Sequence, residues 1–145
     1  MTKDERKKTR DYLNSARDMN RELNELLERR EYLLIKITSP SIRYSSDRVQ
    51  TSGSKDMLGD IVSEIRDIQT MADNLTDEYV ELKEHISEEI NTIEDTKYRD
   101  VLMQKFIDEK KNGEIADAEE IPYKTCITRI RKGEEEFYKL FSYKM

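Results

Sequence analysis

The stretch LGDIVSEIRDIQTMADNLTDEYVELKEHI, residues 58–86, decides the fold class of this chain. Its apolar positions alternate in steps of three and four residues, at Leu58, Ile61, Ile65, Ile68, Ala72, Leu75, Tyr79, Leu82 and Ile86. This is the heptad spacing of a coiled-coil helix, whose apolar seam needs a partner helix to cover it. The seam then slips by four residues to Ile90 and by three to Ile93. We therefore predict one long helix that begins near residues 54–56.

A second long amphipathic helix is predicted between Thr2 and Thr38, which lies just before Pro40. Its apolar stripe contains Tyr12, Ala16, Met19, Leu23, Leu26, Leu33 and Ile37. Arg30 takes the one seam position that breaks this series. Its side chain either snorkels at the edge of the interface, which we favour, or pairs with an acid across the seam and fixes the register.

The two helices have similar predicted lengths and are joined by a hydroxyl-rich segment, residues 39–54, that shows no helical period. Matched helices joined by one loop favour an antiparallel helical hairpin, which we assign to residues 1–95. Pairing within one chain and pairing between two chains would use the same seam. A homodimer through the coiled coil therefore stays open.

Residues 96–145 predict a small domain of shorter helices. We expect a helix over 96–109, a turn or C-cap at Asn112-Gly113, a short helix over 114–120 and a last helix over 124–141. Pro122 is suited to the start of that last helix. A short helix, a tight turn and a longer basic helix follow in the order of a helix-turn-helix. The predicted fold class is all-α.

Composition excludes several classes of protein. The chain has 145 residues, of which 40% are charged and 35% hydrophobic, and its net charge is -6. One Cys and one His are too few for a disulfide scaffold or a multi-histidine metal site. No apolar run approaches the roughly 20 residues of a membrane span. Without a phosphate loop or a nucleophile elbow either, we expect a cytoplasmic protein that is not an enzyme and carries no cofactor or metal.

Two single residues invite functional interpretations that we consider weaker than structural ones. His85 has no second His or Cys near it in the sequence, so an exposed polar residue is favoured over a metal ligand. Cys126 lies among basic residues, which could lower the pKa of its thiol. We favour a small residue on a helix face.

A cluster of cations in the last predicted helix is the best candidate for a binding site. The segment Ile121–Gly133 contains no acid, and its polar residues suited to DNA contact are Lys124, Thr125, Thr128, Arg129, Arg131 and Lys132. Lysine, arginine and threonine side chains bind phosphate oxygens or reach base edges. The run Glu134-Glu135-Glu136 counts against such a site, because carboxylates repel phosphates. Residues 96–145 hold eleven bases and ten acids, so this part of the chain is nearly neutral overall.

Several segments resemble a known family. They are Tyr12-Leu13 with Ala16-Arg17-Asp18, the segment from Asp47 to Asp56, Leu82-Lys83-Glu84, and Tyr98-Arg99 with Leu102. Nearly the whole chain looks like an uncharacterised family encoded in phages and prophages of Gram-positive bacteria. Its members are described as sigma-factor-like late-gene transcriptional regulators, and their C-terminal part is similar to the fourth, DNA-binding region of sigma factors. The resemblance implies that Glu114-Ile115-Ala116 begins the helix-turn-helix and that Ile127, Arg129 and Arg131 lie on the recognition helix.

Two functions remain open from the sequence. The favoured hypothesis is a phage-type regulator that binds DNA, acts with RNA polymerase and uses its hairpin to dimerise or to dock on the polymerase. The alternative is a coiled-coil assembly protein with a degenerate helix-turn-helix and no DNA binding. The negative net charge and the strength of the heptad seam support this alternative.

Overall fold

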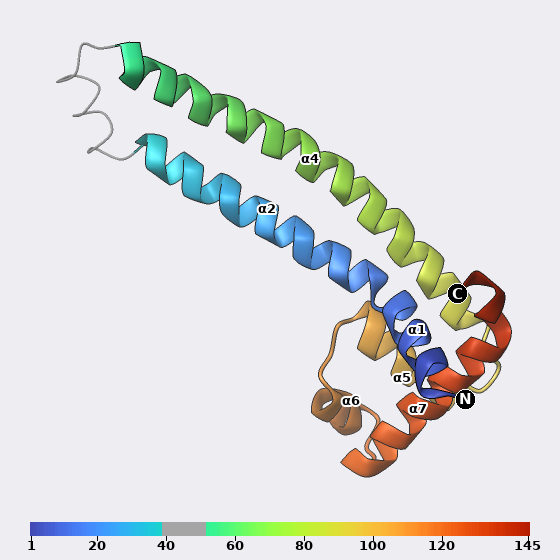
Figure 1. Cartoon of the computed structure of the whole chain (residues 1–145). Coiled ribbons are helices and arrows are strands. Elements are labelled where there is room, and N and C mark those ends of the chain that lie inside the picture. Colours follow the sequence, from blue (N-terminus) through green and yellow to red (C-terminus); the bar gives the residue numbers. More distant parts are fainter. Residues whose placement is uncertain (39–51) are drawn as a thin grey trace. The chain divides into compact units, whose positions relative to one another are not determined.

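The computed structural model describes the backbone of residues 1–38 and 52–145, and the side chains outside residues 39–56. The described residues form helices and their connections, without a strand, which confirms the predicted all-α class (Figure 1). The elements are α1 (Lys3–Leu13), α2 (Ser15–Thr38), α4 (Ser52–Asn91), α5 (Thr96–Leu102), the π-helix η1 (Met103–Ile107), α6 (Asn112–Ala118), α7 (Tyr123–Phe141) and the 3₁₀-helix η2 (Ser142–Lys144). Of the predicted loop 39–54, residues 39–51 lie outside the described part, and Ser52–Ser54 belong to α4.

The predicted first helix is two helices, because the chain leaves regular helix geometry at Asn14. A capping box begins α1: Glu5 N–H donates to the Thr2 hydroxyl, and Thr2 N–H donates to the Glu5 carboxylate. The Ser15 hydroxyl donates to the carbonyl of Tyr12 at 2.6 Å. Side-chain bonds of this kind compete with the helical ladder, which accounts for a break where the apolar stripe continues.

The contacts group the chain into two compact units that differ from the predicted division at residue 95. One unit contains Asn20–Glu78, and the other contains Met1–Met19 together with Tyr79–Met145. The division differs because Leu13 and Ala16 bury their side chains with those of the C-terminal helices. The N-terminal helix α1 therefore belongs with residues 79–145.

The unit Asn20–Glu78 pairs α2 with α4 over a small apolar cluster. Leu33, Ile61 and Ile68 are buried there, with Ile65 half-buried beside them. Arg30 is half-buried and donates to the side-chain oxygen of Gln69 on α4. Arg30 thus bonds across the seam, as in the alternative we favoured less, but its partner is an amide and not an acid.

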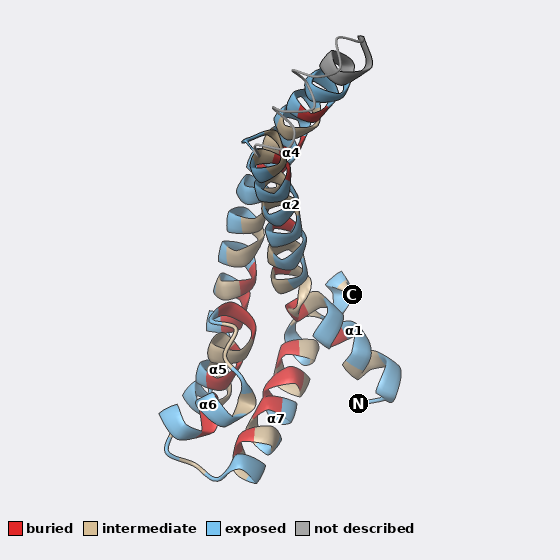
Figure 2. Cartoon of the chain, turned by 90° about the vertical axis from the view of Figure 1, so that its left-hand side faces the viewer, coloured by how far each residue is buried: buried red, intermediate tan, exposed pale blue. Residues whose placement is uncertain are grey.

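In the other unit, buried residues lie on α5, α6 and α7 (Figure 2) and form two apolar clusters. Its largest cluster brings together Leu13, Ala16, Ile86, Ile90, Ile93, Leu102, Phe106, Ile107 and Phe137. Helix α7 passes close to α5, and a Cβ atom added at Gly133 would lie only 3.0 Å from Cγ of Leu102. Gly133 therefore permits this close approach of the two helices, and α7 is held firmly along its buried side.

The segment before α6 differs from its prediction. The expected helix over 96–109 begins as α5, capped by Asp95, and widens into the π-helix η1, where Asp108 N–H donates to the carbonyl of Met103. The left-handed residue that follows is Glu109, with φ 57°. Asn112 and Gly113 begin α6 and are not the turn that the dipeptide predicted.

The turn between α6 and α7 is a Schellman motif. Ile121 N–H donates to the carbonyl of Ala116, and Glu120 N–H donates to the carbonyl of Asp117. Ile121 also packs against the cluster that contains Ile115 and Ala116. Pro122 follows as the N-cap of α7, as predicted. This turn fixes where α7 begins.

Glu120 occupies the left-handed position of this motif, with φ 56°. Non-glycine residues are disfavoured in this conformation, although a glycine loses more chain entropy on folding. We expect Glu120→Gly to raise the free energy of unfolding by about 0.5–1 kcal/mol. Urea denaturation measures this change. The control is Glu119→Gly. Glu119 has an ordinary helical φ of -86°, so glycine is expected to destabilise the protein there. Equal effects of the two variants would contradict the assignment of the motif.

Candidate nucleic-acid interface

The exposed side of α7 carries a stripe of polar residues spaced by four and three. Lys124, Thr128 and Arg131 are exposed and occupy this stripe, because residues four and seven apart share one face of an α-helix. Lys132 is exposed beside them. The opposite side of α7 is buried and includes Cys126, Ile130, Gly133 and Phe137. Four of the six sequence-predicted residues therefore share one solvent-facing side of the helix. We call these four, Lys124, Thr128, Arg131 and Lys132, the cation stripe.

The other two predicted residues, Thr125 and Arg129, lie at the border of this side. Both are half-buried, and Arg129 is close enough to Cys126 to influence its thiol. Thr128 is exposed, but its hydroxyl donates to the carbonyl of Lys124 at 3.0 Å. The hydroxyl oxygen can still accept a hydrogen bond. Lys124, Arg131 and Lys132 are therefore the groups best placed to reach an external anion.

These cations are not neutralised by carboxylates of the described chain. Among the ion pairs of residues 1–38 and 57–145, none involves Lys124, Arg129, Arg131 or Lys132. The first turn of α7 also contains no acid, so the positive end of its helix dipole adds to the same field. The N-terminal half of α7 is thus a positive surface.

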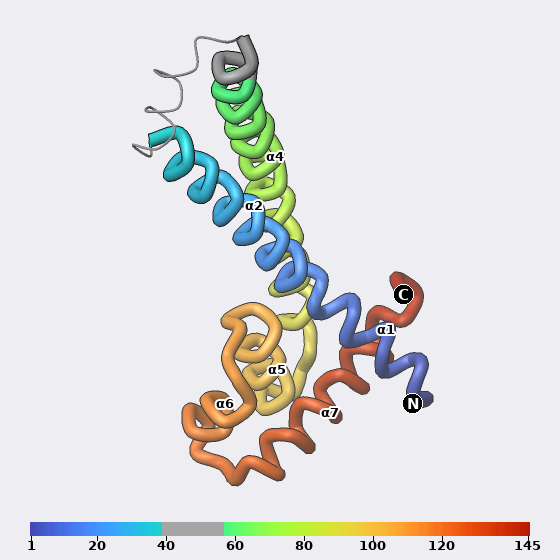
Figure 3. Tube along the Cα trace, turned by 60° about the vertical axis from the view of Figure 1, so that its left-hand side comes forward, coloured from blue at the N-terminus to red at the C-terminus, as the bar shows by residue number. Residues whose placement is uncertain are grey.

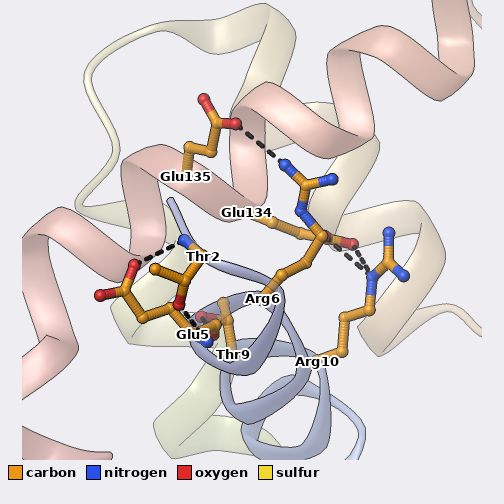
Figure 4. Close-up of polar contacts among 7 residues, drawn as sticks. All are labelled: Thr2, Glu5, Arg6, Thr9, Arg10, Glu134 and Glu135. Carbon is orange, nitrogen blue, oxygen red and sulfur yellow. Dashed lines mark hydrogen bonds and ion pairs between the residues drawn. The ribbon is translucent and has the colours of Figure 1, made fainter.

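The acidic run that follows on α7 is engaged by cations, and Figure 4 shows the contacts of Glu134 and Glu135 with arginines of α1. The side chain of Glu134 is completely buried, and Arg10 on α1 donates from Nε to both of its carboxylate oxygens, at 3.1 and 3.0 Å. Burial raises the pKa of Glu134, and the nearby Arg10 works against this rise. Glu134 therefore points toward α1 and away from solvent.

The remaining two acids of the run are also paired. Arg6 on α1 donates from Nη2 to Glu135 at 3.2 Å, and Lys139 donates to Glu136 at 3.1 Å. Figure 3 shows α1 lying beside the C-terminal half of α7, which brings both arginines within reach. The run Glu134-Glu135-Glu136 counted against a phosphate site in the sequence. In the structure each of its three carboxylates has its own cation.

Lys105 of η1 lies near the same buried contact. Its Nζ donates to the side-chain oxygen of Asn112 at 3.1 Å. Burial lowers the pKa of Lys105, and neighbouring Arg10 and Arg17 lower it further, while Glu134 opposes them. This lysine is half-buried and belongs to the support of α7 and not to its exposed stripe.

Comparison with known proteins identifies a family for this chain. A family described as a protein of unknown function, DUF1492, matches residues 36–137. The chain belongs to the DUF1492 family. The matched segment includes α4, α5, α6 and most of α7, with its cation stripe, and it does not include α1. No match was found among curated proteins or among solved structures.

Cys126, inside the DUF1492 segment, is fully buried, and its thiol donates to the carbonyl of Asn112 at 3.6 Å. Burial raises the pKa of this thiol and outweighs the cations Lys105 and Arg129. The activated thiol that the neighbouring bases could have produced is therefore absent, and Cys126 is a packing residue. His85, also in the segment, is half exposed and lies 3.1 Å from the carboxylate of Glu89.

Sequence reasoning missed the arginines of α1. Arg6 and Arg10 lie four residues apart on one face of the first helix, so both can reach the same neighbouring element. The sequence does not reveal that their partners are Glu135 and Glu134, because the two segments are separated by more than a hundred residues. Of the helices in the described part of this DUF1492 chain, none is both long enough and apolar enough to cross a membrane.

Proposed function

We propose that this protein is a DNA-binding transcriptional regulator of phage type that acts with RNA polymerase. The observation that carries the proposal is the cation stripe of α7, which is exposed and has no carboxylate partner among the described residues. Helix α6, the turn before Pro122 and α7 follow the order of a helix-turn-helix. In this proposal α7 is the recognition helix, and the resemblance to sigma-factor-like regulators supports the same role.

The contacts with DNA would be mostly to phosphates. Lys124, Arg129, Arg131 and Lys132 supply four cations, and Thr125 and Thr128 supply hydroxyls. Neutralising about four phosphates gives a log–log slope of affinity against salt near -3 to -4. The net charge of -6 opposes DNA binding at long range, but at physiological salt exposed charges beyond about 8 Å are largely screened. The local positive surface therefore dominates close to the helix.

The test reverses two exposed charges. We expect Arg131→Glu with Lys132→Glu to weaken binding of a labelled mixed-sequence DNA duplex at least tenfold near 50 mM salt, because two phosphate contacts become repulsions. Fluorescence anisotropy at several salt concentrations measures the affinity and its slope. The control Arg21→Glu with Arg66→Glu makes the same charge change at exposed residues of α2 and α4. Equal losses in both variants, or no binding by the unaltered protein, overturn the proposal.

A second function, assembly through α2 and α4 without DNA binding, is favoured by apolar side chains that these helices expose. They are Tyr32, Ile35, Met57, Leu58, Val62 and Met71. Such side chains can be covered by a second copy of the hairpin. Light scattering measures dimerisation, and the anisotropy assay separates the two functions, because an assembly protein binds no DNA duplex. A regulator can dimerise as well, but its DNA affinity depends on Arg131 and Lys132.

A further inference from the structure

Glu135 lies at the C-terminal end of the cation stripe of α7. The positions Lys124, Thr128, Arg131 and Glu135 are spaced by four, three and four residues, so they share one face of the helix. The side chain of Glu135 is 39% exposed. A free carboxylate at this position would repel the phosphates that the stripe attracts. Arg6 of α1, at 3.2 Å, removes this negative charge from the stripe.

We propose that α1 sets the nucleic-acid affinity of α7 by masking its acidic run, with Arg6 as the decisive residue. The inference rests on the proposed function. Arg6 is a positioning residue, because it acts through Glu135 and not by touching nucleic acid. Its side chain is only 28% exposed, and its guanidinium is engaged with Glu135. Arg10 does the same for Glu134, but there the carboxylate is completely buried and the pair also contributes to the stability of the fold.

Arg6 offers the cleaner test because its ion pair is near the surface. Removing a partly exposed pair has little effect on stability, whereas removing a partner of a buried charge is strongly destabilising. We expect Arg6→Gln to melt within a few degrees of the unaltered protein. An effect of Arg6→Gln on binding therefore reports on charge and not on unfolding.

The experiment is a double-mutant cycle on the full chain, with the same labelled DNA duplex. We expect Arg6→Gln to weaken binding about threefold to tenfold near 50 mM salt and less near 200 mM, because screening shortens the reach of the exposed carboxylate. Glu135→Gln alone should bind at least as tightly as the unaltered protein. The double variant should return to within about twofold of the unaltered affinity, since the local net charge is restored.

Lys8→Gln is the matched control. Lys8 is exposed on the same helix, is in none of the ion pairs of the described residues, and its loss changes the net charge by the same amount. We expect Lys8→Gln to leave the affinity unchanged. The inference is overturned if Arg6→Gln and Lys8→Gln behave alike, or if the double variant stays as weak as Arg6→Gln.

The failure of this inference can be distinguished from the failure of the proposed function. If Arg131→Glu with Lys132→Glu weakens binding and Arg6→Gln does not, the masking role is lost and the function stands. If the unaltered protein binds no duplex near 50 mM salt, both are lost. A salt-dependent loss in Arg6→Gln that Glu135→Gln reverses supports both.

Discussion

The Phe137→Ala variant is expected to lose about 3–5 kcal/mol of unfolding free energy, as complete truncation of a buried aromatic side chain does. Phe137 is fully buried and belongs to the largest cluster. Its ring centroid lies 5.8 Å from that of Tyr12 on α1 and 4.8 Å from that of Phe141. Removing the ring would leave a cavity where α1 and α7 meet, and the surrounding helices could fill it only in part.

Urea denaturation followed by circular dichroism measures this loss. The control is Leu140→Ala, because Leu140 lies on the same helix but is 47% exposed, and its truncation should cost much less. If Phe137→Ala and Leu140→Ala are equally stable, α7 does not pack through the face described here. The fold and the orientation of the cation stripe would then both be wrong.

The Arg10→Ala variant is expected to lose about 3 kcal/mol near neutral pH, although Arg10 itself is 46% exposed. The loss arises at the partner, since the completely buried Glu134 would lose the cation that bonds both of its oxygens, and holding its charge or taking up a proton then costs free energy. Lys105 remains nearby and supplies part of the missing positive charge, which puts the effect at the low end for a broken buried pair.

The pH dependence of this deficit has a definite sign. Burial raises the pKa of Glu134 in the folded protein above its ordinary value of 4.5, and losing Arg10 raises this pKa further. A carboxyl whose pKa is raised in the folded state costs stability in full above that pKa, and the cost declines to zero as the pH falls to the lower pKa of the unfolded chain. We therefore expect the deficit of Arg10→Ala to shrink on acidification and to vanish below about pH 4.5.

Urea denaturation between neutral and acidic pH provides the measurement. Adding Glu134→Gln to Arg10→Ala should recover most of the lost stability at neutral pH and remove its pH dependence, because no buried charge remains. A deficit that is the same at every pH, or that Glu134→Gln does not reduce, would mean that Arg10 contributes by packing and not by charge.

The sequence was sufficient for the helical class and for most element positions. Heptad spacing indicated α4, and the bounds of α7 were predicted to within a residue. The division into two units was harder to predict from the sequence, because the apolar stripe around Leu13 and Ala16 does not indicate which helix will pack against it. The dipeptide Asn112-Gly113 suggested a turn, but Glu109 takes the left-handed conformation instead. The hydrogen bonds of the preceding π-helix decide that geometry, and residue preferences do not.

The cation cluster of α7 was visible from composition alone, because a segment without acids stands out in a heavily charged chain. The structure shows which of its members share the exposed face, namely Lys124, Thr128, Arg131 and Lys132. The burial of Glu134 could not be predicted, since the sequence around a carboxylate that follows a cluster of cations is typical of an exposed helix surface. Only the packing of α1 against α7 shows that this carboxylate is buried. Contacts between distant segments were the information that the sequence lacked.

The packing of α1 against α7 has a consequence for how the protein is made. Arg10 and Glu134 are 124 residues apart, so at about 5–20 residues per second the ribosome releases α1 roughly 6–25 seconds before α7 exists. During this interval the side of α1 that packs on α7 has no native partner and is open to chaperones or to neighbouring nascent chains. Closing so long a loop also slows folding. Maturation of this protein is therefore expected to be limited by the late arrival of its last helix.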